Sequence, residues 1–94
     1  MPKAPWRAKQ EEIASVFDGT RHPLRTKGAP DIESSEFVVE LRVRKKLPRF
    51  LDDAVQRARR SAGDRRAGIL VLQELDSSHA LVVMDLVDFK SWSI

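Results

Sequence analysis

The 94-residue sequence contains no cysteine, and this absence removes several classes of site at once. A chain without cysteine has no disulfide, no thiolate nucleophile and no cysteine-rich zinc site. His22 and His79 are the only histidines, and they are too few and too far apart to replace such a site. Any metal ion would therefore be held by carboxylates and water, which suits Mg²⁺ or Mn²⁺.

A long apolar segment is also missing from the sequence. No run approaches the roughly 20 apolar residues that a membrane-spanning helix needs, and the N-terminus lacks a signal-peptide pattern. We expect a cytoplasmic protein with no membrane partner. The length suits one small domain and leaves no room for a second catalytic one. We therefore expect residues 1–94 to form a single domain, with 1–5 as a loose lead-in.

The net charge of +3 is distributed unevenly along the chain. Between Arg42 and Arg66 the basic residues far outnumber the acids. After Leu72 the balance is reversed, with Lys90 as the base and Glu74, Asp76, Asp85 and Asp88 as the acids. A basic block followed by carboxylates is typical of a protein that binds a polyanion and could present a metal to its phosphate. The simpler interpretation is a solvated helix surface rich in arginine and lysine.

Hydrophobic spacing and turn residues predict the secondary structure. We expect a mixed β-sheet flanked by helices, an α/β fold, with a right-handed parallel crossover between the strands at 36–44 and 68–75. Trp6 and Trp92 are expected to be packing anchors. The expected elements are a helix at 6–17, a basic loop at 19–30, strands at 31–33 and 36–44, a helix at 48–62, strands at 68–75 and 80–84, and a last strand or short closing segment at 85–94.

The central feature is the strand at 36–44, in which one face is apolar and the other carries Glu40 and Arg42. A carboxylate and a guanidinium at mid-strand are costly unless they are paired or used in function. A hairpin with the preceding strand would place Asp31 opposite Glu40. In the first helix, Glu12 lies at the margin of the buried face and could reach this site, whereas Glu11 points toward solvent. The alternative is that Glu40 and Arg42 form an ordinary structural pair.

This layout, with Pro30-Asp31 before Glu40-Leu41-Arg42, resembles the PD-(D/E)XK nuclease superfamily. Within it, the chain is most similar to the small Holliday junction resolvase-type enzymes of archaea and phages, from about Trp6 to about Phe89. The resemblance implies a restriction endonuclease-like α-β-β-α-β-β core and a Mg²⁺ (or Mn²⁺) cofactor. It implies that Asp31, Glu40 and the Leu41 carbonyl are metal ligands, that Glu12 is the helix-one acid and a further candidate ligand, and that Arg42 takes the place of the motif lysine.

The arginine is a departure from the family pattern. Arg42 can hold a phosphate or pair with Glu40, but its pKa is too high for a general base. Water activation would then depend on the metal. Lys46 is an alternative cation if the strand continues that far. Some relatives place a glutamine on the second helix near the site, but here Gln56 faces away from the apolar stripe and Arg57 lies at the closer edge.

Taken together, these features predict a Mg²⁺-dependent, structure-selective DNA endonuclease that resolves Holliday junctions as a homodimer. Two alternatives stay open, namely a non-catalytic DNA-binding or assembly protein on the same fold and a nuclease that acts on simple duplex or single-stranded DNA. The catalytic candidates are Glu12, Asp31, Glu40 and Arg42. The residues expected to contact DNA are Arg21, Arg25, Lys27, Arg44, Lys45, Lys46, Arg49, Arg57 and Arg60.

Overall fold

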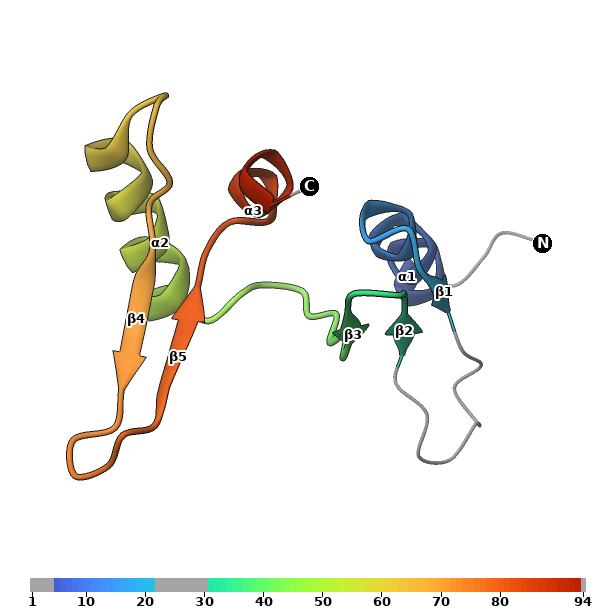
Figure 1. Ribbon diagram of the computed structural model, residues 1–94, viewed down its shortest axis with the longest axis horizontal. Helices are drawn as coiled ribbons and strands as arrows, with labels where there is room; N and C mark the ends of the chain where they lie inside the picture. Colours follow the sequence, from blue (N-terminus) through green and yellow to red (C-terminus); the bar gives the residue numbers. More distant parts are fainter. Residues whose placement is uncertain (1–4, 22–30, 94) are drawn as a thin grey trace. The chain divides into compact units, whose positions relative to one another are not determined.

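The computed structural model describes residues 5–21 and 31–93 of the chain (Figure 1). These residues form three helices and five short strands in the order α1, β1, β2, β3, α2, β4, β5, α3. They group into two compact units, Met1–Arg44 and Lys45–Ile94. Within the described ranges, no helix combines the length and the apolar character needed to cross a membrane.

The first unit packs α1 (Pro5–Val16) against an antiparallel sheet of β1 (Thr20–Arg21), β2 (Ile32–Glu33) and β3 (Val38–Val39). Ile32 is fully buried at the centre of this unit, and Ala14 is buried on the helix. The rings of Phe17 and Phe37 meet edge to face, with their centroids 5.4 Å apart, which adds an aromatic contact between the helix end and the hairpin. The predicted first helix is confirmed to within one residue at each end.

The end of α1 is held by a tight turn. The Gly19 N–H donates to the Ala14 carbonyl at 2.8 Å and the Asp18 N–H to the Ser15 carbonyl at 3.2 Å, a pattern in which Asp18 takes the left-handed conformation with φ of 51°. A Cβ at Gly19 would lie 2.8 Å from the Ile32 Cγ2 atom. Glycine is therefore needed here for close approach to the core.

The predicted hairpin is confirmed, with Ile32 opposite Val39 and Glu33 opposite Val38. Burial alternates as expected, since Phe37, Val39 and Leu41 are half-buried while the residues between them are exposed. The predicted strand at 36–44 is nevertheless too long. Regular pairing covers only Val38–Val39, because the partner strand β2 is itself two residues long.

The second unit combines α2 (Arg49–Ala62) with an antiparallel pair, β4 (Leu70–Gln73) and β5 (Ala80–Val83). Val55 is its buried apolar centre. A Cβ at Gly68 would overlap the backbone of Ala58 and Arg59, so glycine allows the chain to pass directly against α2. The predicted helix and the two strands are confirmed, although both strands are shorter than expected.

Several details of the sequence-based fold are wrong. The apolar run that opens 68–75 predicts a strand covered on both faces. The strand is covered on one face only, because Leu70 and Leu72 are half-buried while Val71 is 57% exposed. The closing segment is a helix, α3 (Leu86–Ser93). The paired strands of the described residues form two antiparallel sheets, with β3 in one and β4 in the other, in place of one mixed sheet with a parallel crossover. The chain is thus a small mixed α/β protein, as expected at the coarser level, and its division into domains stays a prediction.

Candidate active site

The candidate site lies at the open end of the β2–β3 hairpin, and its four residues, Asp31, Glu40, Leu41 and Arg42, are here called the hairpin cluster. Continuing the register of Ile32 and Val39 by one step sets Asp31 opposite Glu40, as the sequence predicts. At this point the backbone ladder is replaced by a side chain. The Leu41 N–H donates to the Asp31 Oδ2 atom at 2.7 Å, and this bond fixes the orientation of the carboxylate.

Arg42 is the central group of the hairpin cluster. Its Nη1 atom lies 3.1 Å from the Asp31 Oδ2 atom and donates to the Leu41 carbonyl at 2.8 Å, while its Nη2 atom lies 3.2 Å from the Glu40 Oε2 atom. These three oxygens belong to the three groups that the sequence predicts as metal ligands. A single guanidinium therefore contacts all three oxygens, two of them through Nη1 and one through Nη2.

The members of the hairpin cluster differ in exposure. The Asp31 side chain is 21% exposed, whereas those of Glu40 and Arg42 are 66% and 72% exposed. The backbone of Asp31 is also held by α1. The side-chain amide of Gln10, a residue only 4% exposed, donates to the Asp31 carbonyl at 3.3 Å. The helix thus anchors the acidic strand end, and the arginine stays accessible to a ligand.

The site residue predicted on the first helix is an acid, Glu12, and the prediction does not include Gln10. Its signal was the spacing of Gln10, Ile13, Ala14 and Phe17, a buried stripe that includes one polar residue. Glu12, the predicted helix-one acid, is 63% exposed and pairs with Lys9 at 3.3 Å. Glu11 is the half-buried acid of the two, so their expected order of exposure is wrong.

No group of three or more acidic or imidazole side chains converges anywhere in residues 5–21 and 31–93. The donor set of the hairpin cluster is smaller, with two carboxylates and one carbonyl. Oxygen donors of this kind suit Mg²⁺, which keeps several waters and needs only one or two carboxylates from a protein. The residues of the hairpin cluster therefore fit such an ion without Glu12.

The basic residues predicted to contact DNA fall into two groups. Arg25 and Lys27 lie outside the described residues, as does the side chain of Arg21. The remaining six are all exposed, and three of them, Arg49, Arg57 and Arg60, lie within an arc of roughly 80° on α2. The Arg49 Nε atom pairs with the Asp53 Oδ2 atom at 3.5 Å, so one carboxylate interrupts this basic face.

A second arginine–carboxylate group, here called the helix clamp, consists of Gln56 and Arg59 on α2 together with Asp85 and Asp88 at the start of α3. Arg59 donates through its Nε atom to the Asp88 Oδ2 atom at 2.8 Å and pairs through Nη1 with the Asp85 Oδ2 atom at 3.3 Å. Gln56 donates to the same Asp85 oxygen at 3.2 Å and accepts from Arg59 at 3.0 Å. These bonds fasten α3 to α2.

Asp85 also caps α3, since its Oδ1 atom accepts from the Val87 N–H at 2.9 Å. This backbone bond, followed by the Gln56 amide and the Arg59 charge, holds the pKa of the Asp85 carboxyl below its ordinary value, against the opposing effect of burial. The bond to Asp88 raises the pKa of Arg59 above its ordinary value. The carboxylates after Leu72 were expected to be available for metal, but two of them are committed to the helix clamp.

Comparison of the chain with protein-family models, with curated proteins and with solved structures finds no match. The site must therefore be interpreted from its own chemistry. It consists of two carboxylates, a backbone carbonyl and the long, exposed side chain of Arg42 at one end of the hairpin. In the structure this set holds its own guanidinium, and its oxygen donors are of the kind that a hydrated divalent cation also takes.

Proposed function

We propose that the chain is a Mg²⁺-dependent DNA endonuclease that cleaves phosphodiester bonds at branched DNA, acting as a Holliday junction resolvase. The observation that supports this proposal is the convergence of the Asp31, Glu40 and Leu41 oxygens on the single guanidinium of Arg42. The resemblance to PD-(D/E)XK nucleases adds support, because the same positions carry its motif. The order from α1 to β5 also contains the α-β-β-α-β-β sequence of elements, with β1 as an additional strand.

The residues of the hairpin cluster would share the work as follows. Asp31 is fixed by the Leu41 N–H and by α1, so its carboxylate provides the rigid side of the cation site. When bound, Mg²⁺ would supply charge to the scissile phosphate and lower the pKa of a water. Arg42 would then leave the carboxylate oxygens and hold a phosphate oxygen, where a preorganised charge stabilises the transition state. Arg42 cannot serve as the general base.

A divalent cation and Arg42 would thus compete for the same three oxygens. This competition would lower the affinity for the metal. In the metal-free protein the arginine would instead reduce the repulsion between the two carboxylates, because it neutralises their charge. We further propose a homodimer, since two nicks on a four-way junction need two sites and one chain provides one.

The test is cleavage of a labelled four-way junction beside a linear duplex of the same sequence, with Mg²⁺ or Mn²⁺ and with chelator. We expect metal-dependent cuts in the junction. Glu40→Gln should lose this cleavage. Glu36→Gln is its matched control, because Glu36 is an exposed acid of the same hairpin outside the cluster. Cleavage of the linear duplex at the same rate would favour the simple nuclease, and binding without any cleavage would reject the enzyme.

A second candidate is a non-catalytic DNA-binding or assembly protein on the same fold. The observation that favours it is again Arg42, because a guanidinium bonded to both carboxylates can act as a permanent structural replacement for the metal. In that case the protein would bind junctions equally well with chelator and with Mg²⁺. Metal binding by the purified protein separates the two candidates.

A further inference from the structure

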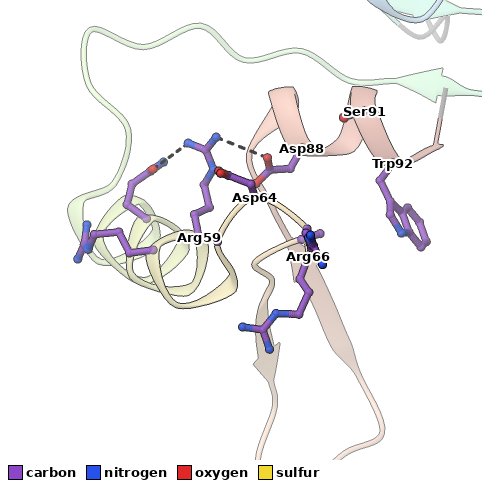
Figure 2. Close-up of a pocket in the computed structure, with 11 residues that line it drawn as sticks. Arg59, Asp64, Arg66, Asp88, Ser91 and Trp92 are labelled. Carbon is purple, nitrogen blue, oxygen red and sulfur yellow. Dashed lines mark hydrogen bonds and ion pairs between the residues drawn. The ribbon is translucent and has the colours of Figure 1, made fainter.

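The second unit contains a pocket of about 490 Å³ between the end of α2, the turn that follows it and α3 (Figure 2). This volume is within the range of sites that hold a small organic ligand or one nucleotide. Four arginines and two aspartates line it, which leaves a net positive charge. The residues used below are Arg59, Arg60, Arg65, Arg66, Asp64 and Trp92.

Two of the arginines are already occupied. Figure 2 shows the Arg59 side chain directed at Asp88, and their bond of 2.8 Å belongs to the helix clamp. Arg66 donates to the Ser61 carbonyl at 2.8 Å and to the Ala62 carbonyl at 3.1 Å, so it closes the end of α2. These fixed side chains form the wall of the pocket.

The other two arginines are available to a ligand. Arg60 and Arg65 are exposed, and neither makes a hydrogen bond or ion pair with another of the described residues. Guanidinium groups match phosphate oxygens with paired donors. Asp64 is the opposing charge, because its carboxylate lines the same pocket and would weaken the binding of an anion. The exposed guanidiniums of Arg60 and Arg65 are therefore the groups of this pocket that could receive a phosphate.

Trp92 supplies an apolar surface to the same pocket. Its side chain extends from α3 away from Asp88 in Figure 2, and the residue is 76% exposed. The expectation that Trp92 is a packing anchor is therefore wrong. An exposed aromatic ring in a pocket that exposed arginines also line is typical of surfaces on which nucleic-acid bases stack while cations hold the backbone.

We propose that this pocket binds one unpaired nucleotide of a DNA strand, with its phosphate on Arg60 and Arg65 and its base stacked on Trp92. The inference rests on the proposed DNA-binding function, and it adds a single-strand site remote in sequence from the hairpin cluster. Branched DNA with single-stranded nucleotides where its arms meet would offer such a nucleotide, so the site would favour these substrates over fully paired ones. A duplex presents phosphates but no free base face.

The test uses a Trp6→Phe background, in which Trp92 is the only tryptophan. Addition of a short single-stranded oligothymidylate should quench the Trp92 fluorescence, and the fully paired duplex should quench it far less. Trp92→Ala should weaken single-strand binding by roughly 5- to 150-fold, the range for losing one stacked base. Leu75→Ala is the matched control, since Leu75 is a 91% exposed apolar residue outside the pocket.

Charge variants test the phosphate side of the pocket. Arg60→Gln and Arg57→Gln each remove one exposed guanidinium from α2, but only Arg60 lines the pocket. We expect Arg60→Gln to weaken single-strand binding by roughly tenfold and clearly more than Arg57→Gln. Asp64→Asn should strengthen it. Circular dichroism and thermal melting confirm that each variant is folded.

The outcomes separate the inference from the function on which it rests. Quenching by single strands together with the ordered losses supports the pocket. If the protein binds four-way junctions but Trp92→Ala matches Leu75→Ala and Arg60→Gln matches Arg57→Gln, the pocket is rejected and the nuclease proposal stands. If the parent protein binds neither junction nor single strand, both proposals are overturned.

Discussion

The hairpin cluster and the helix clamp contain the same kinds of group, one arginine between two carboxylates, yet their surroundings differ. In the helix clamp the Arg59 side chain is 33% exposed and the two aspartates are 23% and 24% exposed. In the hairpin cluster the side chains of Arg42 and Glu40 are 72% and 66% exposed, and only that of Asp31, at 21%, is as buried as the clamp residues. The two arginines therefore differ in exposure, since Arg59 is largely covered in a contact that joins two helices and Arg42 is open to solvent.

The difference also lies in what each carboxylate does for the backbone. Asp85 caps α3 through the Val87 N–H, so its removal would release a helix end. Asp31 accepts the Leu41 N–H at a point where the strand ladder has ended, so it replaces a missing backbone partner. A local bond of this type orients the carboxylate. The comparison predicts that variants of the hairpin cluster change activity, while variants of the helix clamp change stability.

The largest expected effect is on cleavage. Asp31→Asn and Glu40→Gln should each reduce junction cleavage by more than roughly 10²-fold, the loss typical of removing a group that only hydrogen-bonds to a metal ligand. The reason is that each variant removes the charge of a proposed ligand at nearly constant shape. Junction binding should be unchanged or stronger, since a negative group near the phosphate is lost. Single-turnover cleavage and binding assays measure both. Parent-like cleavage by both variants would place the active site elsewhere.

The next effect concerns Arg42. Arg42→Ala should slow single-turnover cleavage on the order of 10²-fold, the scale of losing one preorganised charge, whereas Arg42→Lys should keep much of the rate. The melting temperature of both variants should stay close to that of the parent, because the side chain is mostly exposed. Three equal rates would show that Arg42 is only a structural partner of Glu40. A rate gained only in Arg42→Lys would show that arginine prevents water activation.

Arg59→Gln is the corresponding change in the helix clamp, and it should lower the melting temperature by several degrees while sparing the hairpin chemistry. The reason is that Asp85 and Asp88 would face each other without their shared cation. Arg42→Gln is the matched control. A larger loss of thermal stability in Arg42→Gln than in Arg59→Gln would show that the hairpin cluster, and not the helix clamp, makes the larger contribution to stability.

The smallest effect is the contribution of Asp85 to the pH dependence of stability. Its pKa in the folded protein lies below the ordinary value of 3.8, so its stabilising effect is present above that value and is lost as the pH falls through the lowered pKa. Acid titration of parent and Asp85→Asn, followed by circular dichroism, should show a steeper loss of stability in the parent at acidic pH. Identical acid transitions would show that Asp85 does not contribute to the pH dependence of stability.

The residues that could be predicted from sequence are those with local causes. The helix at 49–62 has a strong apolar stripe and Gly63 after its end, and the β2–β3 hairpin has a period-two pattern around a serine turn. The placement of Asp31 opposite Glu40 follows from that register. The function attached to them rests on the resemblance and stays a prediction.

The features that could not be predicted depend on partners distant in sequence. The α3 helix depends on the Asp85 cap and on Arg59, and its signal in sequence was the pair of acids Asp85 and Asp88 three residues apart. The exposure of Trp92 depends on which surfaces the rest of the chain covers. Sheet pairing is similarly non-local, so a sequence pattern long enough for nine strand residues produced only Val38–Val39 where β2 provides a partner.

The nuclease proposal requires that the oxygens of the hairpin cluster exchange the Arg42 guanidinium for a divalent cation. Titration of the metal-free protein with Mn²⁺, followed by electron paramagnetic resonance of the free ion, tests it directly. We expect binding by the parent, tighter binding by Arg42→Gln because the internal cation is gone, and little binding by Asp31→Asn. The absence of Mn²⁺ binding in both the parent and Arg42→Gln would contradict the account.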